Sequence, residues 1–179
     1  HQGVSNIILS VGYKHESIIN FFGNQYAGAN IQYVIEHEPL GTGGGIKLAL
    51  ELVNDYAFVV NGDTFFDVPL NDFSNFYFKH NSGLAVALKP MRNFERYGTV
   101  EMNEEKIIAF HEKRPCNEGL INGGVYFFHS SLANSFPNGT FSFETEVLEK
   151  MTAAGNLYGR AYNNYFIDIG IPEDYYKAQ

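Results

Sequence analysis

The first 63 residues alternate between short apolar runs and segments with helical spacing, and this alternation limits the possible folds more than any other feature. Apolar runs at residues 6–11, 31–35 and 56–60 predict three buried strands. The segments between them, at residues 15–22 and 46–53, have the spacing of amphipathic helices. Strands that alternate with helices need crossover connections, and such connections predict a parallel sheet covered by helices.

The pattern changes in the second half of the chain. A helix at 72–80 and a strand at 84–88 are followed by short apolar segments separated by turns, which predict mixed or antiparallel strands at 98–102, 107–110 and 124–128. Helical spacing returns at 143–154, a last strand is expected at 165–170, and Pro172 suits the first turn of a closing helix. We therefore expect one α/β domain with a Rossmann-like, mixed but mostly parallel sheet flanked by helices.

Composition excludes several classes of function. With 45% hydrophobic and 18% charged residues the chain is expected to be globular. The net charge of −8 argues against a nucleic-acid surface, and no apolar run approaches the ~20 residues of a membrane span. The single cysteine, Cys116, rules out a disulfide framework within the chain and favours a reducing, cytoplasmic location.

The tetrapeptide Asn61-Gly62-Asp63-Thr64 follows a predicted buried strand. Open α/β sheets bind ligands beyond the carboxyl ends of their strands, so Asp63 stands where a ligand is expected. Its carboxylate suits a hard cation such as Mg²⁺, and Gly62 permits a sharp turn and the close approach of a ligand. The alternative is that Asp63 caps the next turn or helix, which on this tetrapeptide alone is the better explanation.

Asp168 stands in a similar position, at the end of an apolar strand and before Gly170. Two carboxylates so placed are able to converge on one Mg²⁺ ion. The alternative for Asp168 is a helix cap near Pro172.

Four glycines occur in five positions at residues 41–45, after Glu38-Pro39-Leu40. Glycines allow the backbone to approach a ligand closely, and the helix that follows adds its positive N-terminal end. The segment is therefore a candidate site for a base, a ribose or a phosphate, although it is neither a Walker loop nor a GxGxxG fingerprint. The alternative is a flexible turn between strand and helix, and we favour the functional interpretation because so many glycines are a costly way to build a turn.

Two further polar segments are weaker candidates. Glu112-Lys113-Arg114-Pro115 closes the strand at 107–110 and offers a carboxylate and a cation side by side, for a sugar hydroxyl and a phosphate. Asn122-Gly123-Gly124 offers an amide side chain before the next strand. A solvated charged turn and a plain turn are the respective alternatives.

Taken in order along the chain, these segments resemble the motifs of the sugar-phosphate nucleotidyltransferases. Residues 8–50 are most similar to the branch that comprises the D-glycero-D-manno-heptose 1-phosphate guanylyltransferases, with mannose-1-phosphate guanylyltransferases as close neighbours. Each motif alone is weak, and the signal is their common order across nearly the whole chain. The motifs that carry the resemblance are Glu38-Pro39-Leu40-Gly41-Thr42-Gly43, Asn61-Gly62-Asp63-Thr64, Tyr97-Gly98, Glu112-Lys113, Asn122-Gly123-Gly124 and Phe166-Ile167-Asp168-Ile169-Gly170.

The resemblance implies that a sugar 1-phosphate attacks the α-phosphorus of a nucleoside triphosphate, giving an NDP-sugar and pyrophosphate. It also implies a single domain over residues 1–179, with nucleotide bound by about residues 1–90 and sugar phosphate by about residues 91–179. Residue by residue, it implies that Asp63 and Asp168 hold Mg²⁺; that Leu40, Gly41, Thr42 and Gly62 line the nucleotide; that Tyr97, Gly98, Glu112 and Asn122 contact the sugar; and that Lys113 binds its phosphate and acts with the two aspartates in catalysis.

One motif of the family is not found. The family begins with a strand and a glycine-rich loop that grips the triphosphate, and nothing before Asn6 resembles that loop. We therefore expect a chain that is N-terminally truncated relative to the family, with impaired catalysis and with a homo-oligomer or low stability where a strand is missing. The alternatives are a non-catalytic module that binds nucleotide or sugar phosphate, and a metal-dependent glycosyltransferase, which ranks last because Asp63-Thr64-Phe65 lacks the second aspartate of a D-x-D motif.

Overall fold

The computed structural model of the protein describes residues 2–80 and 83–179. Contacts divide the chain into two compact units. Unit 1 comprises His1–Tyr56 and Ser130–Leu148, and unit 2 comprises Ala57–His129 and Glu149–Gln179. The predicted division near residue 90 concerns which ligand each part binds, and it stays a prediction.

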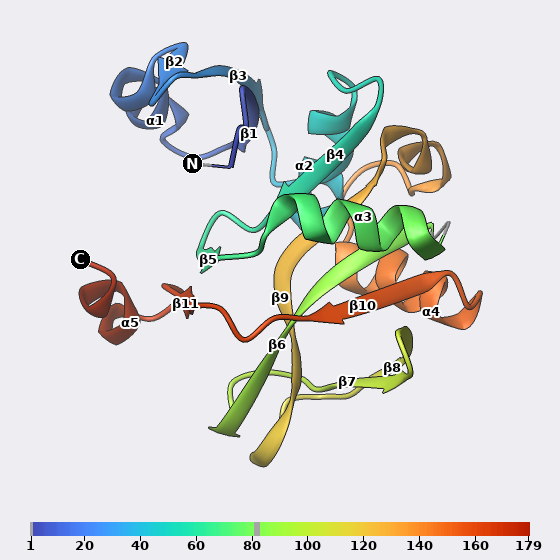
Figure 1. The fold of residues 1–179 in the computed structure, drawn as a ribbon. Helices are drawn as coiled ribbons and strands as arrows, with labels where there is room; N and C mark the ends of the chain where they lie inside the picture. The colour runs from blue at the N-terminus through green and yellow to red at the C-terminus, as the bar shows by residue number, and fades with distance from the viewer. Residues whose placement is uncertain (1, 81–82) are drawn as a thin grey trace. The chain divides into compact units, whose positions relative to one another are not determined.

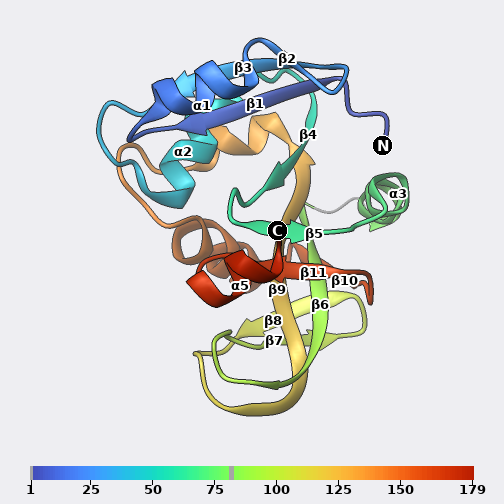
Figure 2. The same ribbon diagram turned by 90° about the vertical axis from the view of Figure 1, so that its left-hand side faces the viewer.

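Unit 1 is built on a small sheet with the strand order β1-β3-β2. β1 pairs with β3 in parallel, and β2 pairs with β3 in antiparallel orientation. Figure 2 shows α1 lying along β1 and β3. The elements are β1 (Asn6–Val11), α1 (His15–Phe22), β2 (Gln25–Tyr26), β3 (Ala29–Ile35), α2 (Gly41–Leu50), the 3-10 helix η1 (Ser130–Ser135) and the π-helix η2 (Glu144–Leu148).

The run of glycines forms the first turns of α2, so the predicted turn followed by a helix at 46–53 is corrected. A Cβ on Gly43 would lie 2.1 Å from the ring of Phe141, and a Cβ on Gly45 would lie 2.6 Å from Glu36 Oε1. The Gly43 amide donates to the Phe141 carbonyl (3.0 Å). The helix therefore needs glycine at these positions because neighbouring atoms pack directly against its backbone.

Unit 2 contains a six-stranded sheet with the order β4-β9-β6-β10-β8-β7. β7 also pairs with β9, so the strands from β9 to β7 form a closed ring of pairings. β5 and β11 form a separate antiparallel pair. The elements are β4 (Tyr56–Val60), β5 (Thr64–Phe66), α3 (Leu70–His80), β6 (Leu84–Phe94), β7 (Val100–Asn103), β8 (Lys106–Phe110), β9 (Cys116–His129), α4 (Glu149–Ala153), β10 (Leu157–Ala161), β11 (Phe166–Asp168) and α5 (Pro172–Lys177).

The core of unit 2 lies between this sheet and α3 (Figure 1). The first half of β6, Leu84–Leu88, is fully buried, as its continuous apolar run predicts. Phe73, Phe76 and Tyr77 form the buried stripe of α3, which was the stripe predicted from their helical spacing.

The mixed α/β class is confirmed, but the pairing is more antiparallel than the sequence predicted. β6 pairs with β10 in parallel, whereas its longer pairing with β9 is antiparallel. β10 was not predicted because Gly159 and Arg160 interrupt its apolar pattern, although Leu157 is fully buried. The expected helix at 143–154 is divided between the π-helix η2 and the α-helix α4.

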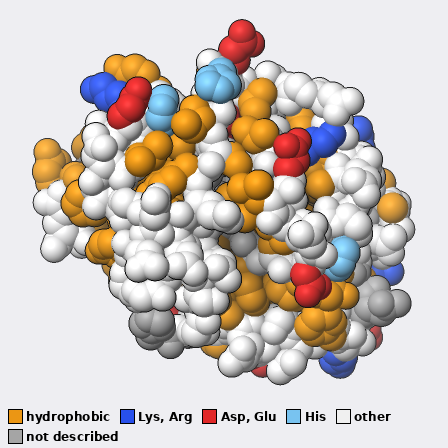
Figure 3. All heavy atoms as spheres, turned by 90° about the horizontal axis from the view of Figure 1, so that it is seen from above, with side chains coloured by type: hydrophobic (Ala, Val, Ile, Leu, Met, Phe, Trp, Pro, Cys, Tyr) orange, Lys and Arg blue, Asp and Glu red, His pale blue; other side chains and the backbone are white. Residues whose placement is uncertain are grey.

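Hydrophobic side chains also remain at the surface (Figure 3). In unit 1 they include Tyr13, Phe21 and Tyr26, of which Tyr13 is 89% exposed. Among residues 2–80 and 83–179, none of the helices is both long enough and apolar enough to cross a membrane.

The packing of α2 predicts an unusual response to a glycine-to-alanine substitution. In an ordinary helix interior this change stabilises by about 1 kcal/mol. Gly43→Ala is instead expected to lower the free energy of unfolding by about 1–3 kcal/mol, because its Cβ overlaps the buried ring of Phe141. Chemical denaturation measures the change, and Gly12→Ala, whose Cβ would meet nothing closer than 3.8 Å, is the control in the same unit. Equal stability of wild type and Gly43→Ala would contradict this account.

Candidate active site

The paired strands β5 and β11 bring the two predicted metal ligands together in unit 2 (Figure 1). Asp168 lies directly opposite Thr64 in the antiparallel ladder, and the Ile169 amide donates to the carbonyl of Asp63 (2.9 Å). Residues 63 and 168 are far apart in sequence, and the ladder places them on neighbouring rungs.

The carboxylate of Asp63 is held by the next residue in the chain, because the Thr64 hydroxyl donates to Asp63 Oδ1 (3.2 Å). Thr64 lies directly opposite Asp168 in the ladder, and residues that lie directly opposite one another project to the same face. Asp63 is exposed and Asp168 partly buried, as expected for a site that a ligand reaches from solvent.

Two carboxylates fit the requirements of Mg²⁺. In the described ranges, no three His, Cys, Asp or Glu side chains group as they would for a metal cage built by protein alone. Mg²⁺ is usually bound by one or two carboxylates together with substrate phosphates and water, so two carboxylates on paired segments are an appropriate donor set.

The carboxylate of Asp168 is held by several donors. Its Oδ2 accepts a hydrogen bond from the Tyr97 hydroxyl (3.0 Å), and its Oδ1 accepts one from the Gly170 amide (2.7 Å). Arg96 approaches Oδ2 at 3.5 Å. An ionised carboxylate has about four acceptor positions, so these contacts fix its orientation and leave room for a cation.

Tyr97 and Asp168 both line a hollow of about 330 Å³. The pKa of Tyr97 is raised to about 12. Burial of the phenol is the larger cause, and its hydrogen bond to Asp168 is the second. The phenol therefore stays protonated at neutral pH and acts as a donor. The hollow is lined by Met91, Asn93, Phe94, Glu95, Arg96, Tyr97, Phe166, Ile167, Asp168 and Asp174.

At Gly98 the backbone of the Tyr97 segment packs closely against the segment that contains Glu112. A Cβ on Gly98 would lie 2.4 Å from the carbonyl oxygen of His111, so only glycine permits this approach. Glu112 and Lys113 follow β8 immediately, and both are exposed. The structure thus places four of the predicted sugar-phosphate residues on two adjoining segments of unit 2.

Asn122 serves a structural purpose inside β9, which the sequence analysis placed in a turn before a strand. Its Nδ2 donates to the Tyr126 hydroxyl (2.8 Å), and its Oδ1 accepts from the Gly124 amide (3.0 Å). The pairing of β6 with β9 shifts register here, which identifies a bulge. A contact between Asn122 and a sugar stays a prediction.

The residues predicted to line the nucleotide base lie in unit 1 and already have partners. The Thr42 hydroxyl donates to Glu144 Oε2 (2.9 Å) and accepts from the Phe143 amide (2.9 Å). Gly41 has φ +71°, and a Cβ there would lie 2.6 Å from the carbonyl oxygen of Phe141. These contacts fix the shape of residues 40–42, and nucleotide binding by that segment stays a prediction.

Sequence reasoning missed Glu36, Arg96 and Asp174. Glu36 accepts from the Ser10 hydroxyl (2.8 Å) and from the Leu40 amide (3.1 Å), and so supports the start of α2. Arg96 forms an ion pair with Asp174. Charged residues in turns, next to strand ends and in the first turn of a helix are usually solvated, so no pattern in the sequence distinguished these three.

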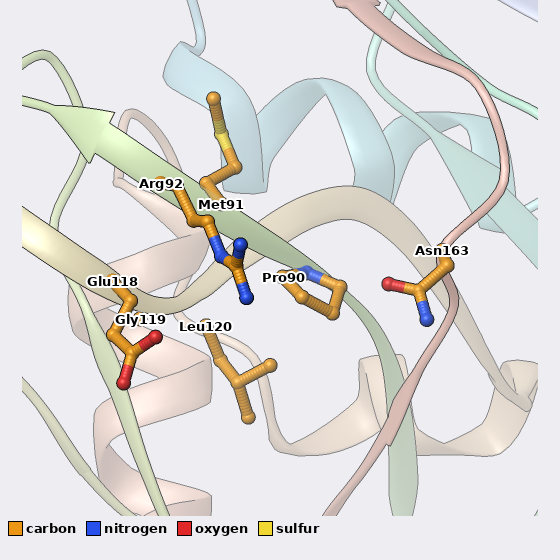
Figure 4. A pocket seen from close by; sticks show the side chains of 7 residues that line it. All are labelled: Pro90, Met91, Arg92, Glu118, Gly119, Leu120 and Asn163. Atoms are coloured by element: carbon orange, nitrogen blue, oxygen red, sulfur yellow. The ribbon is translucent and has the colours of Figure 1, made fainter.

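A larger hollow of about 600 Å³ lies elsewhere in unit 2 (Figure 4). It holds none of the predicted site residues, whereas the smaller hollow contains both Tyr97 and Asp168. The larger hollow is lined by Pro90, Met91, Arg92, Glu118, Gly119, Leu120 and Asn163.

Comparison with protein families identifies the chain. The model of the family described as nucleotidyl transferase matches residues 1–179. The chain belongs to the nucleotidyl transferase family. The D-glycero-alpha-D-manno-heptose 1-phosphate guanylyltransferase of Aneurinibacillus thermoaerophilus is 47% identical over 99% of this chain and 78% of that protein. The enzyme of the same name from Campylobacter jejuni is 45% identical over 98% of this chain and 78% of its own length. The predicted family and branch are thereby confirmed.

Solved structures share the fold of this chain. A crystal structure of HddC from Yersinia pseudotuberculosis complexed with GMP-PN has a TM-score of 0.87 and 36% identity, covering 99% of this chain and 78% of that one. A glucose-1-phosphate thymidylyltransferase structure from Bacillus anthracis, at 21% identity and a TM-score of 0.79, shows the same fold.

The shifted pKa of Tyr97 predicts a titration. A tyrosine whose folded-state pKa exceeds its unfolded value of about 10 stabilises the fold fully below that pH, and this stability is lost as pH rises through about 12. Ultraviolet absorbance of tyrosinate, taken as the difference between wild type and Tyr97→Phe, is expected to show one group titrating near 12. A difference spectrum that titrates near 10 would contradict the burial and hydrogen bonding described here.

Proposed function

We propose that this protein transfers GMP from GTP to a heptose 1-phosphate, giving a GDP-sugar and pyrophosphate. The names of its relatives at 45% and 47% identity support both the nucleotide and the sugar, and a structural neighbour was crystallised with GMP-PN. The observation that carries the proposal is the β5–β11 ladder, which brings the backbone segments of Asp63 and Asp168 together in unit 2.

Asp63 and Asp168 would hold the Mg²⁺ ion to which the triphosphate binds. When Mg²⁺ is bound by Asp63 and Asp168, it neutralises the phosphate oxygens and makes the α-phosphorus accessible to an anionic nucleophile. Gly62 lies next to Asp63 with nothing within 4 Å of where a Cβ would be, so the backbone there is open to the nucleotide. Leu40, Gly41 and Thr42 contact the base and ribose through a backbone whose shape is already fixed by Phe141 and Phe143.

The sugar 1-phosphate is held by the segments around Tyr97 and Glu112. Tyr97 and Gly98 present a ring and a close backbone to the sugar, Glu112 accepts hydroxyl hydrogens, and Asn122 adds a contact from β9. Lys113 pairs with the 1-phosphate and supports its approach in line to the α-phosphorus. Catalysis by positioning and charge neutralisation needs no covalent intermediate.

The test is pyrophosphate release, measured with each of GTP, ATP, CTP and UTP and with heptose 1-phosphate or mannose 1-phosphate, in the presence of Mg²⁺. We expect release with GTP and heptose 1-phosphate to exceed the other combinations. A preference for mannose 1-phosphate would overturn the assigned sugar. Binding of GTP without any release would favour the non-catalytic module.

Removing one carboxylate at a time distinguishes a specific metal ligand from a nearby aspartate that contributes only negative charge. Asp63→Asn is expected to lower kcat about 100-fold or more, because an amide replaces a charged oxygen ligand. Asp67→Asn makes the same chemical change at an exposed aspartate nearby and is expected to keep wild-type kcat. Steady-state kinetics at saturating substrates compares the two, and equal losses in both variants would reject Asp63 as a specific ligand.

Gly62 provides a test of nucleotide approach that is independent of folding. Gly62 does not adopt a positive φ, and an added Cβ would meet nothing within 4 Å, so the fold itself accepts alanine. Gly62→Ala is expected to leave the melting temperature unchanged and to raise KM for GTP. Thermal melts and initial-rate kinetics measure the two quantities, and an unchanged KM would remove Gly62 from the nucleotide site.

A further inference from the structure

Arg96 lies between two carboxylates that come from different elements of unit 2. One terminal nitrogen pairs with Asp174 on α5, and the other lies 3.5 Å from Asp168 Oδ2 at the end of β11. Arg96 itself belongs to the connection between β6 and β7, directly before Tyr97. A single guanidinium therefore links the β6–β7 connection, the candidate metal ligand and the C-terminal helix.

The planar fork of arginine gives this link a defined direction. Because Asp174 holds one nitrogen, the second is directed at Asp168. The Asp168 oxygen it approaches is the one that accepts the Tyr97 hydroxyl, and the guanidinium also lies 5.5 Å from the centre of the Tyr97 ring. Arg96 and Tyr97 thus hold Asp168 from the same side.

We propose that Arg96, anchored by Asp174, is a positioning residue that fixes the Asp168 carboxylate in the orientation that binds the divalent cation. This inference rests on the proposed function. Arg96 does not contact the reacting atoms, and it acts through Asp168. Groups that orient a metal ligand typically change metal affinity 10–100-fold when they are removed.

Electrostatics and orientation act in opposite directions at this site. The positive charge of Arg96 repels a cation, so its removal alone favours metal binding, whereas the loss of orientation disfavours it. Asp174 balances the charge of Arg96. A double variant, R96M/D174N, removes the pair without changing the net charge. Lys177, which lies 3.2 Å from Asp174 Oδ1, keeps Glu173 as a partner (3.0 Å), so the loss of orientation is the main change that the variant measures.

Unit 2 offers a matched control in the pair formed by Arg160 and Asp72. Its nitrogen-to-oxygen distance is 2.9 Å, the Tyr162 hydroxyl donates to Asp72 (2.8 Å), and Arg160 is 37% exposed, as is Arg96. The same kinds of group thus form the same kind of network without an aspartate of the candidate site. R160M/D72N removes an equivalent ion pair at the same net charge.

The experiment measures Mn²⁺ binding by electron paramagnetic resonance in the presence of a non-hydrolysable GTP analogue. R96M/D174N is expected to bind Mn²⁺ about tenfold more weakly than wild type, and R160M/D72N to bind as wild type does. In kinetics, the activation constant for Mg²⁺ is expected to rise in R96M/D174N while kcat at saturating Mg²⁺ is retained. The single variant R96K, in which Asp174 is unchanged, is expected to bind Mn²⁺ nearly as weakly as R96M/D174N. An ammonium group lacks the planar fork that reaches both carboxylates.

Each other outcome overturns a defined part of the argument. Unchanged Mn²⁺ affinity in R96M/D174N, or equal losses in both double variants, rejects a positioning role for Arg96. Full recovery in R96K shows that charge alone suffices and rejects orientation by the fork. If wild type itself binds no Mn²⁺ with the GTP analogue, the proposed function fails as well, whereas a wild type that binds normally confines the failure to Arg96.

Discussion

The pairing of β5 with β11 is the constraint on which the candidate site depends. Three residues of each strand form this antiparallel ladder, yet it joins positions 63–66 to positions 166–169 across most of the sequence of unit 2. The ladder fixes the backbone of both aspartates, and the Thr64 hydroxyl donates to the Asp63 carboxylate. Carboxylates on two paired segments are suitable oxygen ligands for a divalent cation.

Several neighbouring groups stabilise the negative charge of the Asp168 carboxylate. Tyr97, Gly170 and Arg96 all direct donors at the Asp168 carboxylate, and Asp174 in turn orients Arg96. The pKa of Tyr97 rises because burial and the neighbouring carboxylate both disfavour the phenolate. A nucleotidyl transferase uses little covalent chemistry of its own, so a rigid arrangement of charges is what such a site has to supply.

The glycines serve different purposes that their sequence pattern does not distinguish. Gly43, Gly45 and Gly98 are needed because another part of the chain packs against their backbone, which is a structural reason. Gly62 has open space beside it, so the fold gives no such reason. The preference for a functional interpretation of residues 41–45 therefore overlooked two packing partners: Phe141, which lies far away in sequence, and Glu36, which directly follows β3.

Sequence alone determined the mixed α/β class, the approximate places of most helices and strands, the family, and both aspartates as a candidate pair, because apolar periodicity and motifs are read directly from the order of residues along the chain. Predictions on location, membrane and nucleic-acid partners and oligomeric state stay predictions. Tertiary structure decided the antiparallel share of the sheet, the start of α2 at Gly41, and the places of β10, Arg96 and Asp174. These depend on contacts between residues distant in sequence, whose free energy no local pattern encodes.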